Sequence, residues 1–118
     1  MARILWVEDE PDIRVLVENV LLAEGHAVDA AATLKEGSEL LESADYDLVL
    51  VDGRLPDGTG IPLAEEAVAR EIPALVMTAY AFILSELAAN PGRYHFLLKP
   101  VRPDELIEAV DLALSRAA

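Results

Sequence analysis

The sequence predicts one α/β domain, a doubly wound, five-stranded parallel sheet covered by five helices. Three observations predict it. Short apolar runs alternate with amphipathic segments along the chain, several of these runs stop at charged residues, and 118 residues with 53% hydrophobic content suffice for one core. Strict alternation with short connections favours parallel strands, because right-handed crossovers place helices on both faces of a sheet. Residues 1–118 are therefore expected to form a single domain.

The first strand and helix are expected within the first 25 residues. The run from Ala2 to Val7 is apolar except for Arg3 and stops at an acidic cluster, which is typical of a buried strand. Pro11 suits the first turn of a helix, and Gly25 suits its end. The apolar positions between them recur at helical spacing and predict a core-facing stripe of Ile13, Leu16, Val17, Val20 and Leu21.

The remaining elements follow in the same alternation. Strands are expected over Ala27–Ala31, Leu48–Val51, Pro73–Met77 and Tyr94–Leu98, and helices over Leu34–Ala44, Ile61–Arg70, Phe82–Leu87 and from Pro103 onward. A turn cluster of Asn90, Pro91 and Gly92 separates the last two strand and helix units. Pro103 opens the final helix, and the acids that follow it are favourable in a first helical turn.

The charge and composition exclude several classes of protein. Nine basic against 22 acidic residues give a formal net charge of −13, which repels nucleic acid and anionic membranes. The apolar runs are far shorter than the roughly 20 residues that span a bilayer, and there are no cysteines for disulfides or thiolate metal sites. We therefore expect a cytoplasmic protein that binds neither nucleic acid nor membranes directly.

Chemically active side chains follow four of the expected strands. The first strand leads to Glu8 and Asp9, the third to Asp52, the fourth to Thr78 and the fifth to Lys99. In a doubly wound sheet the carboxyl ends of the strands share one rim, where sites form. Three carboxylates in one pocket repel one another and need a cation, and oxygen ligands suit a hard ion such as Mg²⁺, with Mn²⁺ as an alternative.

The order of these motifs resembles the response-regulator receiver family, also described as CheY-like. The chain has an acidic pair after strand one, Asp52 after an apolar strand, a Thr78-Ala79 step, a Lys99-Pro100 step and a Leu55-Pro56-Asp57-Gly58 turn. Each motif alone is weak, whereas the ordered set is specific and covers essentially the whole chain. The resemblance implies a flavodoxin-like fold with strand order 2-1-3-4-5.

The resemblance also implies a mechanism of two-component signal transduction. Asp52 would accept a phosphoryl group from the phosphohistidine of a sensor histidine kinase or a phosphotransfer protein. Asp9 and Asp52 would bind Mg²⁺ directly, the backbone carbonyl of Arg54 would add a ligand, and Glu8 would act through water. Lys99 and the Thr78 hydroxyl would bind phosphoryl oxygens. Such a domain assists its own phosphorylation and dephosphorylation and turns over no separate substrate.

By the same resemblance, phosphorylation would change a protein-binding surface. Thr78 would move toward the phosphoryl group and Phe96 would turn inward. The face formed by helix four, strand five and helix five would then bind a downstream protein. Arg54 and Tyr80 would tune the lifetime of the phosphoryl group. A homodimer is left open.

Plainer interpretations stand beside these. Asp52 is also explained as a turn-forming acid before Gly53, the pair after strand one as helix caps, and Phe96 as an ordinary core aromatic. Val15 and Leu22 are either incidental surface apolars or part of a kinase-docking surface. His26 and His95 lack the spacing of a metal pair.

Other functions compete with phosphorylation at Asp52. The chain is alternatively a degenerate receiver that binds a partner without phosphorylation, or a receiver excised from a longer regulator. A haloacid-dehalogenase-type enzyme needs a second aspartate where Arg54 stands. Dinucleotide binding needs a glycine-rich loop where the chain has carboxylates.

Overall fold

The protein is built around a five-stranded parallel sheet with the strand order β2-β1-β3-β6-β7. The computed structural model describes residues 2–79 and 95–117. The strands span Arg3–Val7 (β1), Ala27–Ala31 (β2), Leu48–Asp52 (β3), Ala74–Thr78 (β6) and His95–Leu98 (β7). All four strand pairs are parallel, so the predicted fold class and strand order are confirmed.

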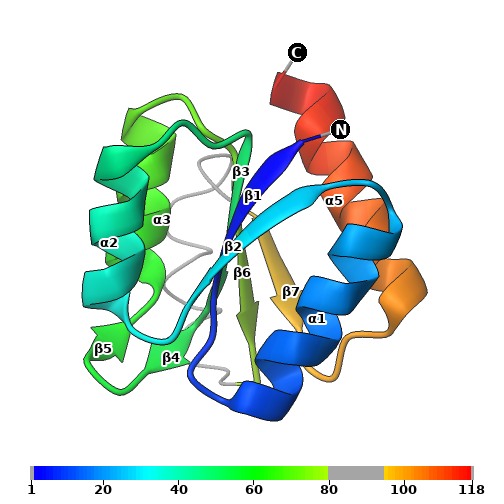
Figure 1. Ribbon diagram of the computed structural model, residues 1–118, viewed down its shortest axis with the longest axis horizontal. Helices are drawn as coiled ribbons and strands as arrows, with labels where there is room; N and C mark the ends of the chain where they lie inside the picture. Colours follow the sequence, from blue (N-terminus) through cyan, green and yellow to red (C-terminus); the bar gives the residue numbers. More distant parts are fainter. Residues whose placement is uncertain (1, 80–94, 118) are drawn as a thin grey trace.

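Helices cover both faces of this sheet. They span Pro11–Ala23 (α1), Leu34–Ser43 (α2), Ile61–Ala69 (α3) and Pro103–Ala117 (α5). Figure 1 shows α2 and α3 on one side of the sheet and α1 and α5 on the other. The helix expected over residues 82–87, its closing turn and Tyr80 lie outside the described residues.

A short antiparallel hairpin follows β3. Its strands are Arg54–Leu55 (β4) and Gly58–Thr59 (β5), which flank the predicted turn. These two strands were not predicted from the sequence, because two residues are too few to show an apolar alternation. The hairpin lies at the carboxyl end of the sheet, beside the start of α2 (Figure 1).

Alternation along the central strands divides the core into two layers. In β1, Leu5 and Val7 pack in the cluster that contains α2 and α3 residues, whereas Ile4 and Trp6 pack in the cluster that contains α1 and α5 residues. Both faces of the strand are therefore apolar, as expected for a parallel sheet with helices on each side. Burial of this kind, rather than hydrogen bonding, supplies most of the favourable free energy of folding.

The predicted core stripe of α1 is wrong at one position. Val17 and Leu21 are buried, but Leu16 is 60% exposed, beside the exposed Val15 and Leu22. Consecutive helical residues are rotated by about 100°, so burying Val17 and Leu21 turns Leu16 toward solvent. The predicted end of the helix is confirmed, because Gly25 adopts a positive φ of 87°.

Phe96 does not lie in the core. Its side chain is 46% exposed, so the interpretation of Phe96 as an ordinary core aromatic is wrong. β7 is an edge strand in which Leu97 packs against the cluster of α1 and α5. Because neighbouring strand residues point to opposite faces, Phe96 points away from that cluster.

Candidate functional site

Strand register brings the polar strand ends to one edge of the sheet. Asp52 of β3 pairs with Met77 of β6, and Thr78 pairs with Leu98 of β7. Backbone hydrogen bonds continue the sheet one residue beyond β1 and β7. Glu8 N–H donates to the Ala31 carbonyl at 2.9 Å, and Lys99 N–H donates to the Thr78 carbonyl at 2.9 Å. These bonds fix where each site residue leaves the sheet.

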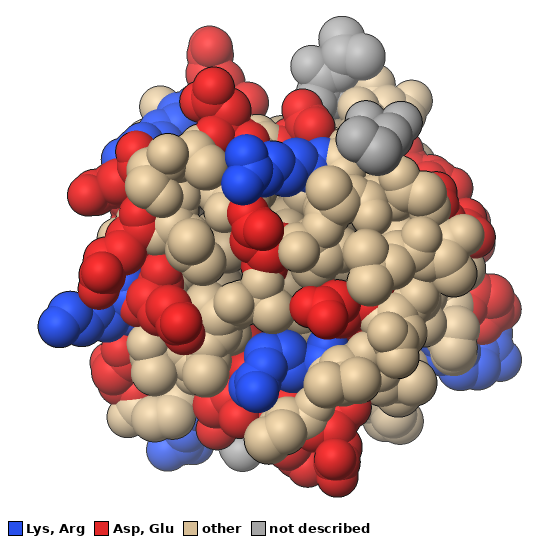
Figure 2. Space-filling model, viewed as in Figure 1, with Lys and Arg blue, Asp and Glu red and all other residues tan. Residues whose placement is uncertain are grey.

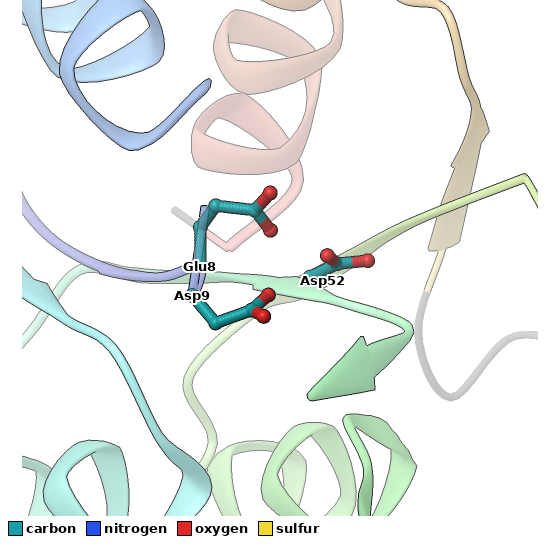
Figure 3. A group of neighbouring side chains, drawn as sticks. All are labelled: Glu8, Asp9 and Asp52. Atoms are coloured by element: carbon teal, nitrogen blue, oxygen red, sulfur yellow. The ribbon is translucent and has the colours of Figure 1, made fainter. Parts of the chain in front are cut away.

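Three carboxylates meet at this edge. One oxygen atom from each of Glu8, Asp9 and Asp52 lies within 4.8 Å of the others. Figure 3 shows the three side chains close together at this edge. Glu8 and Asp52 are buried, at 1% and 6% exposure, whereas Asp9 is exposed. Carboxylates so close repel one another, so the arrangement favours a bound cation or a proton.

Lys99 supplies positive charge to the two buried carboxylates. Its Nζ atom lies 3.1 Å from Asp52 Oδ2 and 3.6 Å from Glu8 Oε1. The lysine side chain is only 20% exposed, so solvent screens these ion pairs less than it would at an open surface. One ammonium group offsets only part of the charge of three carboxylates.

Burial and the nearby charges change the ionisation of Glu8. Burial, followed by the neighbouring carboxyl group of Asp52, raises the pKa of Glu8 to about 8, while Lys99 acts in the opposite direction. Among the described residues, Oε2 of Glu8 is the buried side-chain oxygen without a hydrogen-bond partner. An ionised carboxylate with a bare buried oxygen is costly, which explains why the pKa rises.

The residues present fit a hard divalent cation. They offer carboxylate oxygens from two strand ends, which are the ligands that Mg²⁺ prefers, and Mg²⁺ usually keeps several waters. The unpartnered Glu8 Oε2 is a ready acceptor for one such water. An acidic cluster alone would not indicate a metal site. The fit rests on the carboxylate ligands together with the unpartnered buried oxygen of Glu8.

The carboxylates line a cavity of about 480 Å³ that opens to solvent. Its walls are formed by Glu8, Asp9, Glu10, Ile13, Asp52, Arg54, Leu55, Pro56, Ala79 and Lys99. Arg54 N–H donates a hydrogen bond of 3.3 Å to Asp52 Oδ1, which orients that carboxylate. Thr78 is fully buried one residue before Ala79. A cavity of this volume has room for a phosphate-sized group beside Asp52.

The backbone that carries Asp52 leaves no space for a side chain at Gly60. Gly60 N–H donates to the Gly53 carbonyl at 3.1 Å. A β-carbon at Gly60 would clash with the backbone oxygen of Asp52. This glycine was not singled out from the sequence. Its only sequence signal was its place directly before the α3 helix.

Gly60→Ala is expected to destabilise the protein by roughly 1–3 kcal/mol or more, since the clash is with backbone that cannot rotate away. Gly37→Ala is the comparison variant, because its β-carbon would meet side-chain atoms of Val7 and Leu63, at 2.9 and 3.2 Å, and no backbone atom is among its nearest neighbours. Urea unfolding of both variants tests this. Equal stability losses would contradict the close approach at Asp52.

The hairpin after β3 is tied to α2 by Asp57. Its carboxylate accepts hydrogen bonds from Leu34 N–H at 3.0 Å and Lys35 N–H at 3.1 Å. The hydrogen bond from Leu34 N–H is the main cause of the lowered pKa of Asp57, and the bond from Lys35 N–H adds to it. Asp57 therefore caps a helix 23 residues away in sequence, and its turn propensity was the only signal of a structural role in the sequence.

The outer surface is strongly acidic. Figure 2 shows acidic side chains spread over the face in view, with basic side chains in a few separate spots.

No helix in the described part of the chain is both long enough and apolar enough to cross a membrane.

The fold and the site together define a class of protein: a doubly wound α/β domain whose carboxylates and lysine meet at the carboxyl end of the sheet. Comparison with known proteins makes the class specific. The profile of the response regulator receiver domain matches residues 4–111. The chain belongs to this family of two-component signalling domains.

Curated relatives support the assignment. The chain is 40% identical over 113 residues to the response regulator protein PilR of Pseudomonas aeruginosa, covering 93% of this chain and 25% of PilR. It is 38% identical over 117 residues to the transcriptional regulatory protein PdtaR of Mycobacterium tuberculosis, covering 97% of this chain and 57% of PdtaR. The chain thus spans a quarter to just over half of these two relatives.

Solved structures share the whole fold. A CheY-like receiver domain from Methanospirillum hungatei superposes with a TM-score of 0.90 at 32% identity, covering 99% of this chain and 96% of that one. The response regulator TrrA of Thermotoga maritima, solved in complex with Mg²⁺ and BeF, gives a TM-score of 0.85 at 33% identity, covering 96% and 99%.

Proposed function

We propose that Asp52 accepts a phosphoryl group from the phosphohistidine of a sensor histidine kinase or phosphotransfer protein, in a reaction that depends on Mg²⁺. One observation carries the proposal: the buried Asp52 carboxylate lies beside Glu8 and Asp9 and 3.1 Å from the Lys99 ammonium. A strand-end turn acid would need none of these neighbours. Membership of the receiver family supports the same assignment.

The reaction moves one phosphoryl group between two nucleophiles. An oxygen of Asp52 forms a bond to phosphorus while the phosphorus–nitrogen bond of the donor breaks, and the electron pair of that bond returns to the imidazole. The product is an acyl phosphate. Lys99 Nζ and the Thr78 hydroxyl bind phosphoryl oxygens, and Arg54 N–H holds Asp52 in position. The transition state needs positioning and charge stabilisation more than covalent help.

Asp9 and Asp52 would hold the cation directly, with the Arg54 backbone carbonyl as a further ligand and Glu8 acting through water. Bound Mg²⁺, or Mn²⁺ in its place, would neutralise charge on the transferred group. The structure of TrrA, a different protein, was solved in complex with Mg²⁺ and BeF, which supports this choice of ion.

Mg²⁺ is expected to stabilise the folded protein, because it relieves repulsion among three carboxylates that are separated on unfolding. At 100 times its dissociation constant, a ligand of the native state adds about 2.7 kcal/mol. For a domain of this size that raises the melting temperature by roughly 10 °C. Thermal melts in Mg²⁺ and in excess chelator measure this difference, and Asp9→Asn should reduce it. Identical melts in both buffers would contradict the cation site.

Phosphorylation would be read out as a change of surface. Thr78 would move toward the phosphoryl group, and Phe96, which is 46% exposed, would turn inward into the space this leaves. The surface altered would be the face of β7 and α5, together with the helix expected before β7, and Arg54 and Tyr80 would tune how long the phosphoryl group survives. A downstream protein, or a second copy of the chain, would bind this face.

Receiver domains interact with sensor histidine kinases and with downstream effectors. For this chain we place the kinase contact at the exposed apolar side chains of α1, Val15 and Leu22, which are 52% and 48% exposed. Residues 1–118 would act as one receiver domain in the cytoplasm, accepting a phosphoryl group without turning over a separate substrate. Because the chain spans only part of PilR and PdtaR, the output of the signal is also a proposal.

Trp6 gives a direct optical test. It is fully buried on β1, two residues before Glu8. Fluorescence would be followed while Mg²⁺ and then beryllofluoride are added to wild type and to Asp52→Ala. A saturable response that needs Mg²⁺ and is lost in the variant is expected. Intact response in Asp52→Ala would contradict Asp52 as the acceptor and favour a phosphorylation-independent interaction domain.

A further inference from the structure

Arg14 reaches from the first turn of α1 back to the loop that carries the acidic pair. Its Nη1 atom donates hydrogen bonds to the backbone carbonyl of Glu8 at 2.9 Å and to that of Asp9 at 3.3 Å. These are the two residues whose side chains enter the carboxylate cluster with Asp52. One guanidinium group therefore holds both peptide units that aim these carboxylates.

Arg14 is itself held firmly. Its backbone N–H donates to the Glu10 carbonyl at 2.9 Å, and its carbonyl accepts a hydrogen bond of 3.1 Å from the indole nitrogen of Trp6. Trp6 is fully buried in the core layer of α1 and α5. The arginine thus connects the rigid core to the loop.

In the described part of the chain, the start of α1 gives this loop little other support. Glu10, the N-cap residue of α1, makes no side-chain capping hydrogen bond, and Pro11 occupies the first turn. Proline has no backbone N–H to donate. The Glu8 N–H, in the peptide before, donates to the Ala31 carbonyl of β2, and the next two carbonyls, those of Glu8 and Asp9, accept from Arg14.

The choice of acceptor matters for a cation site. Both hydrogen bonds from the guanidinium go to carbonyl oxygens, so they leave the carboxylate oxygens of Glu8 and Asp9 available for metal and water. A guanidinium stays charged at any physiological pH and presents its donors in a rigid plane. It fixes the peptide orientation without competing with the cation for its ligands.

We propose that Arg14 is a positioning residue for the divalent cation: by holding the Glu8 and Asp9 carbonyls it pre-orients the carboxylates for binding. This inference rests on the proposed Mg²⁺ site. Residues that orient metal ligands typically change metal affinity about 10–100-fold when they are lost. We therefore expect Arg14→Ala to weaken Mg²⁺ binding about tenfold, at the lower end of that range.

Calorimetric titration of Mg²⁺ into wild type, Arg14→Ala, Arg14→Lys and Arg70→Ala tests the proposal. Arg70, which directly follows α3, is the matched control, because its Nη1 also donates to a backbone carbonyl, that of Leu41 in α2 at 3.5 Å. Arg70→Ala should bind Mg²⁺ like wild type. Arg14→Lys keeps a cationic donor and should recover part of the affinity, and it serves as the test protein if Arg14→Ala does not fold.

A second readout separates positioning from chemistry. With acetyl phosphate as donor, Arg14→Ala should need more Mg²⁺ for half-maximal phosphorylation, while the rate at saturating Mg²⁺ stays near that of wild type. Wild-type Mg²⁺ affinity in Arg14→Ala and Arg14→Lys, or an equal loss in Arg70→Ala, would overturn the role of Arg14. Failure of wild type to bind Mg²⁺ would instead overturn the proposed cation site.

Discussion

Replacing Asp52 with asparagine is expected to reduce phosphoryl uptake from acetyl phosphate to background while leaving the fold in place. An amide is not a nucleophile toward phosphorus, and no other described carboxylate is both buried and within 3.1 Å of Lys99. The variant also removes one negative charge from a crowded cluster, so its melting temperature in chelator should equal or exceed that of wild type. Intact-protein mass spectrometry measures the uptake.

Asp57→Asn is the control for this experiment. Asp57 lies five residues further along the chain, in the turn between β4 and β5, but its carboxylate caps α2 and is exposed. This variant should take up phosphoryl groups like wild type, with reduced thermal stability. Wild-type uptake by Asp52→Asn, or loss of uptake in Asp57→Asn alone, would contradict the assignment of Asp52.

The second large effect concerns pH and Glu8. Without divalent cations the pKa of Glu8 is about 8 in the folded state, against 4.5 as its ordinary value. Between these two values the folded state binds more protons than the unfolded state, so the stability that Glu8 contributes is fully present below pH 4.5 and is lost as pH rises toward 8. The loss is on the order of a few kcal/mol, because a tenfold change in a proton-binding constant corresponds to about 1.4 kcal/mol.

Glu8→Gln should remove this part of the pH dependence, since glutamine mimics the protonated acid and does not ionise. In urea unfolding at pH 8 with chelator, the variant should be more stable than wild type, and the difference should shrink as pH approaches 4.5. Glu10→Gln, which changes an exposed acid of the same loop, should keep the wild-type slope. Parallel wild-type and Glu8→Gln profiles would contradict the raised pKa.

Much of the fold could be predicted because its signals are local. The central strands are uninterrupted apolar runs, and both faces of β1 and β3 are buried under helices. Asp52 ends one strand and Lys99 directly follows another. Because parallel strands share a carboxyl edge, both residues are expected at the same edge of the sheet. Topology alone therefore indicated which side chains meet.

What could not be predicted depends on contacts between distant segments. Leu16 was misplaced because the rotation of α1 is set by packing against the sheet, and the apolar pattern allowed more than one face. Asp57 caps a helix 23 residues away, and Gly60 is required by the backbone of Asp52. Arg14 was not singled out from the sequence, although it lies three residues before the buried Val17. Its acceptors become visible only once the loop is folded.

The most direct test of phosphorylation at Asp52 locates the modified residue in wild-type protein. After incubation with acetyl phosphate, borohydride reduces an acyl phosphate on aspartate to the corresponding alcohol, which peptide mass mapping identifies. We predict a single modified site, Asp52, when Mg²⁺ is present and none when it is chelated. Modification at Asp9 or Asp57 instead, or no modification in Mg²⁺, would contradict Asp52 as the phosphoryl acceptor.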